Sequence, residues 1–221
     1  MPRPPCGAGH VCVTLPPVTP DLPLTRLLHE EAAARGLRDP GAPLPGVPEV
    51  FALVRDLPYA RAGTHDPAGI VRGWRGTCST KHELLAALLA ERGLASTVVA
   101  CTQEITPPPG APPELVALGG GRPVVDVHNY LIVHAPGGDM VVDATWPLGA
   151  AAAGLPVNPE WVWGEDQTVA CTPLETWPVP AEESVAAFKA RLLRERYTPE
   201  ELERRDAFIR EVGKLFLAGR A

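Results

Sequence analysis

Apolar residues recur at helical spacing in several separate stretches of the chain. The strongest stripe consists of the four leucines between positions 84 and 89, and it predicts a helix over residues 77–92 that Gly93 ends. A second capping pattern, formed by Thr80 and Glu83, would start this helix further along the chain. The two patterns leave the first residue of the helix undecided by a few positions, but both predict the helix itself.

Weaker helical patterns flank this central one. They predict helices near residues 22–36 and 50–57, with an irregular stretch at 58–77 between them and the central helix. Near the C-terminus, Thr198, Pro199 and Glu201 form a capping box before a second apolar stripe. We therefore expect a C-terminal helical extension over about 181–219, folded as a hairpin.

Strand patterns follow the central helix. The β-branched run at 95–102 predicts a first strand, and residues 124–134 and 140–145 predict two more. The Ala-Pro-Gly-Gly-Asp segment between the last two has turn chemistry, so these strands should pair antiparallel. Two further short strands are possible, at His10 to Leu15 and near Val169.

Composition and charge narrow the class of protein. Of the 221 residues 45% are hydrophobic and 21% charged, which is typical of a folded chain, and the length favours a single domain over 1–221. The net charge of −6 argues against a nucleic-acid partner, because such partners attract basic surfaces. We find no run of about 20 apolar residues and no signal-peptide pattern, so we expect a cytoplasmic protein with no membrane partner.

Three positions in order carry the candidate chemistry. Cys78 lies at the predicted start of the central helix, where unpaired N–H groups favour a thiolate. His128 in the next long strand can act as its base, and Asp143 can orient the imidazole. His128 and Asp143 are roughly equidistant from the predicted turn, so a tight hairpin would place them opposite each other.

These motifs, GTCSTKHELLAALLAERGL, DVHNYLIV and VVDATWP, resemble the core of the transglutaminase-like superfamily of cysteine enzymes. The resemblance covers about residues 73–147. It implies an α+β fold in which the nucleophile helix packs on an antiparallel sheet, here with added N-terminal helices. It also implies Cys78 as nucleophile, His128 as general base and Asp143 as orienting carboxylate, acting without a cofactor.

The activity that follows from this resemblance is cleavage or transfer of an amide acyl group in a peptide or a small amide substrate. The backbone N–H of Cys78 is the first expected oxyanion donor, with Tyr59 and Trp74 as open candidates for the second. Ser79 stands where the animal enzymes carry an aromatic residue, which favours hydrolysis over cross-linking. We expect three supporting residues around the triad: His82, Asn129 and Trp146.

Two other functions use the same residues. Cys78, His82, His128 and Asp143 are all zinc-competent, so a zinc site is one alternative to the triad. A non-catalytic binding module on the same scaffold is the other. The close group of Cys6, His10 and Cys12 has ligand types but lacks the spacing and number of a zinc site, so we expect no bound metal there.

Overall fold

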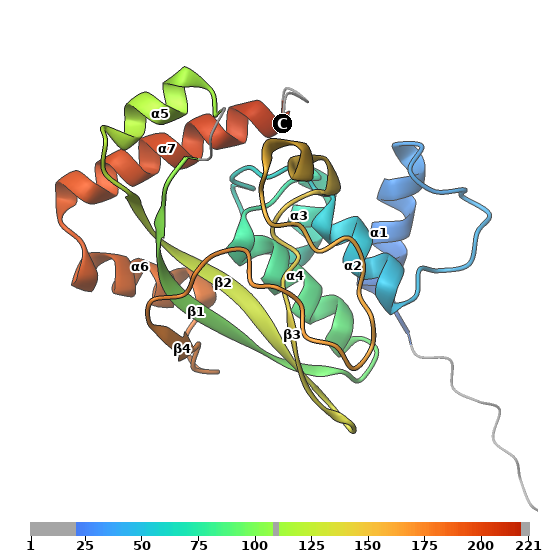
Figure 1. Ribbon diagram of the computed structural model, residues 1–221. Coiled ribbons are helices and arrows are strands. Elements are labelled where there is room, and N and C mark those ends of the chain that lie inside the picture. The colour runs from blue at the N-terminus through green and yellow to red at the C-terminus, as the bar shows by residue number, and fades with distance from the viewer. Residues whose placement is uncertain (1–20, 108–110, 218–221) are drawn as a thin grey trace, which may run out of the picture.

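The computed structural model describes residues 21–107 and 111–217 (Figure 1). The possible strand at His10–Leu15 and the Cys6–His10–Cys12 group lie outside these residues. The elements, in chain order, are α1 (Pro23–Ala34), α2 (Val47–Arg55), α3 (Pro67–Gly73), α4 (Cys78–Ala90), β1 (Ala95–Ile105), α5 (Pro113–Gly119), β2 (Val124–Ala135), β3 (Gly138–Val142), the 3₁₀ helix η1 (Leu148–Ala153), β4 (Thr176–Pro178), α6 (Val185–Arg196) and α7 (Pro199–Leu217).

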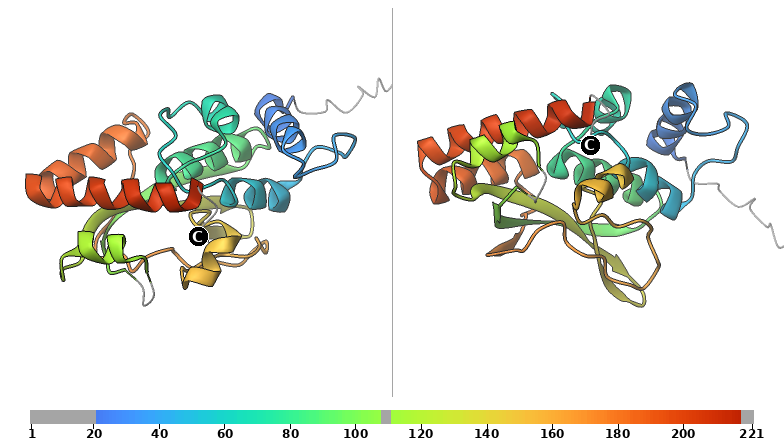
Figure 2. Two further views of the ribbon diagram at one scale, coloured as in Figure 1. Left: turned by 90° about the horizontal axis from the view of Figure 1, so that it is seen from above. Right: turned by 45° about the horizontal axis from the view of Figure 1, so that its top comes forward.

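One antiparallel sheet organises these elements. Its strand order is β3-β2-β1-β4, and β2 and β1 pair along almost their whole length. Helices α1 to α4 and α6 lie on one side of the sheet (Figure 2). The chain between η1 and β4 first passes α2, where Trp161 packs on Phe51, and then covers the other face of the sheet with Val169 and Cys171. The expectation of an α+β fold is confirmed.

The central helix starts and ends where local chemistry dictates. Thr77 is its N-cap, and its backbone N–H donates to the Thr80 hydroxyl at 2.9 Å, so Cys78 is the first helical residue. At the other end the N–H of Leu94 reaches the Leu89 carbonyl at 3.0 Å, and Gly93 adopts a φ of 72°. This is the pattern of a helix closed by a left-handed glycine, as the sequence predicts.

The hairpin of β2 and β3 departs from the expected register. Leu131 pairs with Val142, so the register if continued would place Thr145 rather than Asp143 opposite His128. Moreover β3 ends at Val142, and Asp143 follows the strand instead of lying in it. The prediction that His128 and Asp143 face each other directly was therefore wrong. The tight turn at Pro136–Gly137 shifts the pairing by two residues, which leaves Asp143 in a diagonal position.

Two helices lie in segments that we did not expect to be helical. α3 occupies part of the stretch read as irregular, and the carboxylate of Asp66 caps it by accepting from the Gly69 N–H at 2.7 Å. α5 begins at Pro113, after the proline-rich break. In addition the extra strand forms at Thr176–Pro178 and not near Val169, whose backbone makes no strand pairs.

Two helices, α6 and α7, follow one another at the C-terminus, and we call them together the C-terminal hairpin. Thr198 separates α6 from α7, and its hydroxyl and backbone N–H both bond to the Glu201 carboxylate, at 2.9 and 2.8 Å. Apolar residues of the hairpin pack against the sheet, with Phe188 and Leu192 on Val127. None of the helices in the described part of the chain is both long and apolar enough to span a lipid bilayer.

The main core joins α4 to α2, α3 and the β2–β3 hairpin, and Leu88 lies in its centre with no exposed surface. We expect Leu88→Ala to lower the free energy of unfolding by about 2–5 kcal/mol, because it removes buried methylenes and leaves a cavity. Leu37→Ala is the matched control, since Leu37 is 57% exposed and should change stability by less than about 0.5 kcal/mol. Urea unfolding of both variants measures the difference; equal losses would contradict this account of the core.

Candidate active site

The three candidate residues meet at a free edge of the sheet. Because β3 ends at Val142, residues 124–130 of β2 pair with β1 on one side only. The first turns of α4 lie beside this edge, and their side chains bond to Ala144 and Thr145 in the chain that leaves β3. Cys78, His128 and Asp143 are thereby brought together, although they lie 50 and 15 residues apart in sequence.

His128 and Asp143 form a buried ion pair. The Nε2 of His128 lies 2.8 Å from Oδ2 of Asp143, and both residues are 2% exposed. Although burial alone would raise the pKa of Asp143, the charge and hydrogen bond of His128 lower it far below the usual range. The carboxylate in turn holds the pKa of His128 well above its ordinary value, against the effect of burial.

Asp143 is fixed by more than the imidazole. Its Oδ1 accepts from the Thr145 N–H at 3.0 Å, and its Oδ2 accepts from the Ala170 N–H at 2.8 Å. Its own backbone is bonded to the side chains of Asn158 and Gln167. The segment between η1 and β4 therefore determines where this carboxylate points.

Cys78 lies between His128 and a lysine from the C-terminal hairpin. Burial would raise the pKa of its thiol, but the charge of Lys189 and the neighbouring imidazole of His128 outweigh burial and lower the pKa to about 6. The Nζ of Lys189 is 3.7 Å from the sulfur. Since Nε2 of His128 is occupied by Asp143, Nδ1 is the ring nitrogen that remains for the thiol. The lowered pKa of Cys78 and the raised pKa of His128 both favour a thiolate paired with an imidazolium.

Lys189 belongs to an ion cluster that sequence reasoning missed. Asp126 on β2 lies 3.6 Å from the Lys189 ammonium, and it accepts from Nε of Arg205 on α7 at 2.6 Å. A signal for both cations was present in the sequence. Lys189 and Arg205 fall on the apolar stripes of their helices, at positions where a charge needs a buried partner.

His82 connects the nucleophile helix to the Asp143 segment. Its Nδ1 donates to the Cys78 carbonyl at 2.7 Å, and its Nε2 accepts from the Ala144 N–H at 2.9 Å. Complete burial lowers its pKa to about 4, so the ring stays neutral and holds this one tautomer. Both ring nitrogens of His82 are thus engaged by backbone groups, and neither is left for the Cys78 thiol.

Lys81 makes a second connection of the same kind. Its Nζ donates to the carbonyls of Arg55 and Thr145, at 2.7 and 2.9 Å, and the residue has no exposed surface. Burial lowers its pKa to about 7. The sequence did not single out Lys81, because its place on the helix does not distinguish it from a solvent-facing lysine.

The other two expected supporting residues lie close to the triad. Asn129 accepts from the Ser79 hydroxyl at 2.7 Å, which ties the start of α4 to β2. Trp146 packs on Tyr59 and Phe216, with ring centroids 4.4 and 5.7 Å away. Ser79 therefore has a structural partner in the neighbouring strand.

The two candidates for the second oxyanion donor lie in different places. Tyr59 is buried beside Cys78; burial and then the nearby Cys78 charge raise the pKa of its phenol far above normal, so it remains a hydrogen-bond donor. Trp74 ends α3 in a left-handed conformation and stacks under Arg35 of α1, 4.6 Å from its ring centre. Of the two, Tyr59 is near the sulfur.

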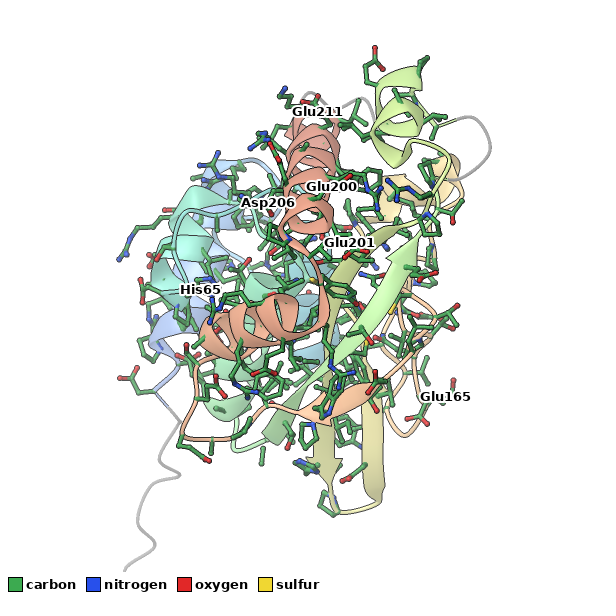
Figure 3. The ribbon with its side chains drawn as sticks, turned by 90° about the vertical axis from the view of Figure 1, so that its left-hand side faces the viewer. His65, Glu165, Glu200, Glu201, Asp206 and Glu211 are labelled. Atoms are coloured by element: carbon green, nitrogen blue, oxygen red, sulfur yellow. The ribbon has the colours of Figure 1, made fainter. Side chains whose placement is uncertain are left out.

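A cleft of about 450 Å³ opens beside the start of α4. It lies between the start of α4, the loop from Arg61 to His65 and the C-terminal hairpin, and Asp206 of α7 bonds to Arg61 of this loop (Figure 3). Its lining includes the polar and charged side chains of Thr77, Ser79, Asp126, Lys189 and Arg205. Cys78 lies between two lining residues in sequence, Thr77 and Ser79, and is itself only 1% exposed.

The zinc alternative finds little support in this arrangement. Within residues 21–107 and 111–217, no three His, Cys, Asp or Glu side chains are grouped as metal ligands. Both ring nitrogens of His82 are engaged by backbone groups, and Nε2 of His128 by Asp143.

Comparison with known proteins adds no relative. No family model matches the chain, and neither the curated proteins nor the solved structures contain a match. The function must therefore be argued from the site itself.

We expect the thiol of Cys78 to ionise with a midpoint near pH 6, because the Lys189 and His128 charges outweigh burial. The thiolate is absent below this pH and present above it. Ultraviolet thiolate absorbance, recorded as the difference between the unmodified protein and Cys78→Ser across pH, measures this midpoint without requiring a reagent to enter the site. A midpoint at the value of a free cysteine would contradict the ion pair.

Proposed function

We propose that the protein is a thiol enzyme that cleaves or transfers an amide acyl group with Cys78, His128 and Asp143. The observation that carries the proposal is the arrangement around one buried sulfur: a thiol of pKa about 6 next to an imidazole whose far nitrogen lies 2.8 Å from Asp143. A thiolate is a good nucleophile, and an imidazolium beside it is a proton donor for the leaving group.

The steps follow from these positions. The thiolate of Cys78 attacks the carbonyl carbon, and the π electrons move to the oxygen, which the Cys78 N–H and the Tyr59 hydroxyl can receive. His128 then gives its proton to the departing amine, and the C–N bond breaks to leave a thioester. Water, deprotonated by His128, attacks the thioester, and the acid and the thiol are released. Asp143 stabilises the imidazolium and its orientation throughout.

The chain order of the site supports a transglutaminase-like core. A helix that begins with Cys78 is followed by three antiparallel strands, of which the second bears the histidine and the third leads to the aspartate. The three motifs occur in this same order in the superfamily. We infer a core of about residues 73–147, with the C-terminal hairpin as an addition that also lines the site.

A peptide or a small amide is the substrate class that fits this chemistry, and hydrolysis is the favoured outcome. Transfer to an amine requires a channel that keeps water from the thioester. The cleft beside Cys78 instead carries charged groups, among them Asp126, Lys189 and Arg205, which attract water. The cleft therefore supports release of a free acid.

We expect electrophilic peptide and amide probes to form a covalent adduct on Cys78, and turnover of any amide substrate to require it. Asp143→Asn should lower kcat by about 10²–10⁴-fold, because it removes the charge that stabilises the imidazolium. Mass spectrometry locates the adduct, and a panel of blocked peptide amides and anilides gives the rates. Cys101→Ala is the matched control, since Cys101 is a second buried thiol outside the triad.

A substrate that Cys78→Ala still converts would argue against the thiol mechanism. An adduct on Cys101 or Cys171 in place of Cys78 would give the nucleophile to another residue. A rate for Asp143→Asn equal to that of the unmodified protein would remove Asp143 from the mechanism.

We expect the acyl-enzyme to yield mainly free acid even when a primary amine is present at millimolar concentration, because water reaches the charged cleft. Mass spectrometry measures the ratio of free acid to amine conjugate. A reaction in buffer without the amine is the reference. Predominant conjugate would assign the protein to acyl transfer.

A further inference from the structure

We propose that Lys189 is a catalytic residue, which holds Cys78 as a thiolate and then donates a hydrogen bond to the oxyanion that forms beside it. This role rests on the proposed function, because it requires that Cys78 attacks a carbonyl carbon. It adds a further residue to that same site. Lys189 comes from α6, outside the segment on which the resemblance depends.

The position of the ammonium is the first argument. Its nitrogen is 3.7 Å from the sulfur of Cys78, so it is within reach of the atom that reacts. The side chain is only 12% exposed, and at low exposure the attraction between opposite charges is screened weakly. A cation held there stabilises negative charge on the sulfur more than one at the surface would.

The ion pair with Asp126 is the second argument. Asp126 lies 3.6 Å from the ammonium and is bonded to Arg205, which leaves it little freedom to move. The carboxylate therefore anchors the Lys189 ammonium. A long flexible side chain is in this way held ready, as a preorganised electrostatic catalyst requires.

The number of donors is the third argument. An ammonium has three N–H groups, and in the described part of the chain the nitrogen of Lys189 contacts only Cys78 and Asp126. Lys189 also lines the cleft. A third N–H is therefore left for an oxygen in the cleft, and the carbonyl oxygen of an acyl group joined to the sulfur would lie in this region.

The charge movement during reaction fits this role. When the sulfur attacks, the negative charge passes from sulfur to the carbonyl oxygen, a shift of about 3 Å. Lys189 keeps all its protons, and no bond to it forms or breaks. It serves the ground-state thiolate and the oxyanion in turn, while His128 alone transfers protons.

Other titratable side chains around the sulfur of Cys78 also influence the pKa of its thiol. They lie on the elements packed around it, and they are His128 and Asp126 on β2, Asp143 after β3, Tyr59 before α3, Lys81 and His82 on α4, and Arg205 on α7. Among the cations near the sulfur, the charge of Lys189 lowers the pKa of the thiol most and that of His128 comes next.

The test compares Lys189→Met and Lys189→Arg with Lys214→Met. Methionine keeps the length of the stem but removes the charge, and Lys214 is a lysine on the same hairpin with 65% of its side chain exposed. Thiolate absorbance across pH should show the Cys78 midpoint raised by roughly 1 pH unit or more in Lys189→Met and unchanged in Lys214→Met. Lys189→Arg, which keeps a charge, should restore most of the midpoint.

Turnover provides the second readout. At a pH above the raised midpoint, where the thiol is ionised in every variant, kcat of Lys189→Met should still be about 10²–10³-fold lower, because the oxyanion has lost a donor. Circular dichroism checks that the variant is folded, and Lys189→Arg serves if it is not. Thiolate absorbance needs no substrate, so an unchanged midpoint overturns the role of Lys189 even if the proposed activity fails.

Two results would overturn the proposal. One is an unchanged midpoint in Lys189→Met. The other is a kcat of Lys189→Met equal to that of the unmodified protein at a pH high enough to ionise the thiol. Lys189 would then stabilise the thiolate but not the oxyanion.

Discussion

A carboxylate removed from water must have its lone pairs satisfied by hydrogen-bond donors of the protein. Asp143 is such a carboxylate, since it is 2% exposed. Its two oxygens accept from His128, Thr145 and Ala170, and its backbone is bonded to Asn158 and Gln167. These partners come from β2, from the end of the hairpin and from the segment before β4. The sheet and the irregular chain that covers it are therefore held in one arrangement by a single buried charge.

Asp126 is a second buried carboxylate that needs partners from the protein. This carboxylate is 1% exposed, and its two cationic partners come from α6 and α7. The C-terminal hairpin is thus attached to the sheet by charge as well as by the apolar contacts of Phe188 and Leu192. One of the partners, Lys189, lies beside the thiol, so the contact that fixes the hairpin also shapes the candidate site.

Much of the fold was predictable because its signals are local. Thr77 and Gly93 mark the ends of α4, and Thr198 with Glu201 marks the start of α7, through interactions within a few residues of each. The register of the hairpin was not predictable to the residue, because a turn of one length admits several pairings. Asp143 lies near His128 all the same, since a diagonal neighbour is still within reach of a long side chain.

The parts of the site that were missed depend on contacts across the chain. Lys189 is 111 residues from Cys78, and nothing in its local pattern names its partner. A lysine on an apolar stripe signals that a buried anion exists, but not where. The order of cysteine, histidine and aspartate could be recognised because each lies in a motif of its own. The place of the cations Lys189 and Arg205 in the site could not be recognised in the same way, because they belong to helices that any amphipathic sequence could form.

The distance between Lys189 and Cys78 has a consequence for the protein's own integrity. A primary amine 3.7 Å from a sulfur is well placed to intercept any acyl group carried on that sulfur, and the resulting amide on the lysine would be permanent. An ammonium ion has no lone pair and cannot attack. Asp126 lies 3.6 Å from the same nitrogen and is the carboxylate paired with this ammonium ion, so the ion pair stands between the protein and acylation of its own lysine.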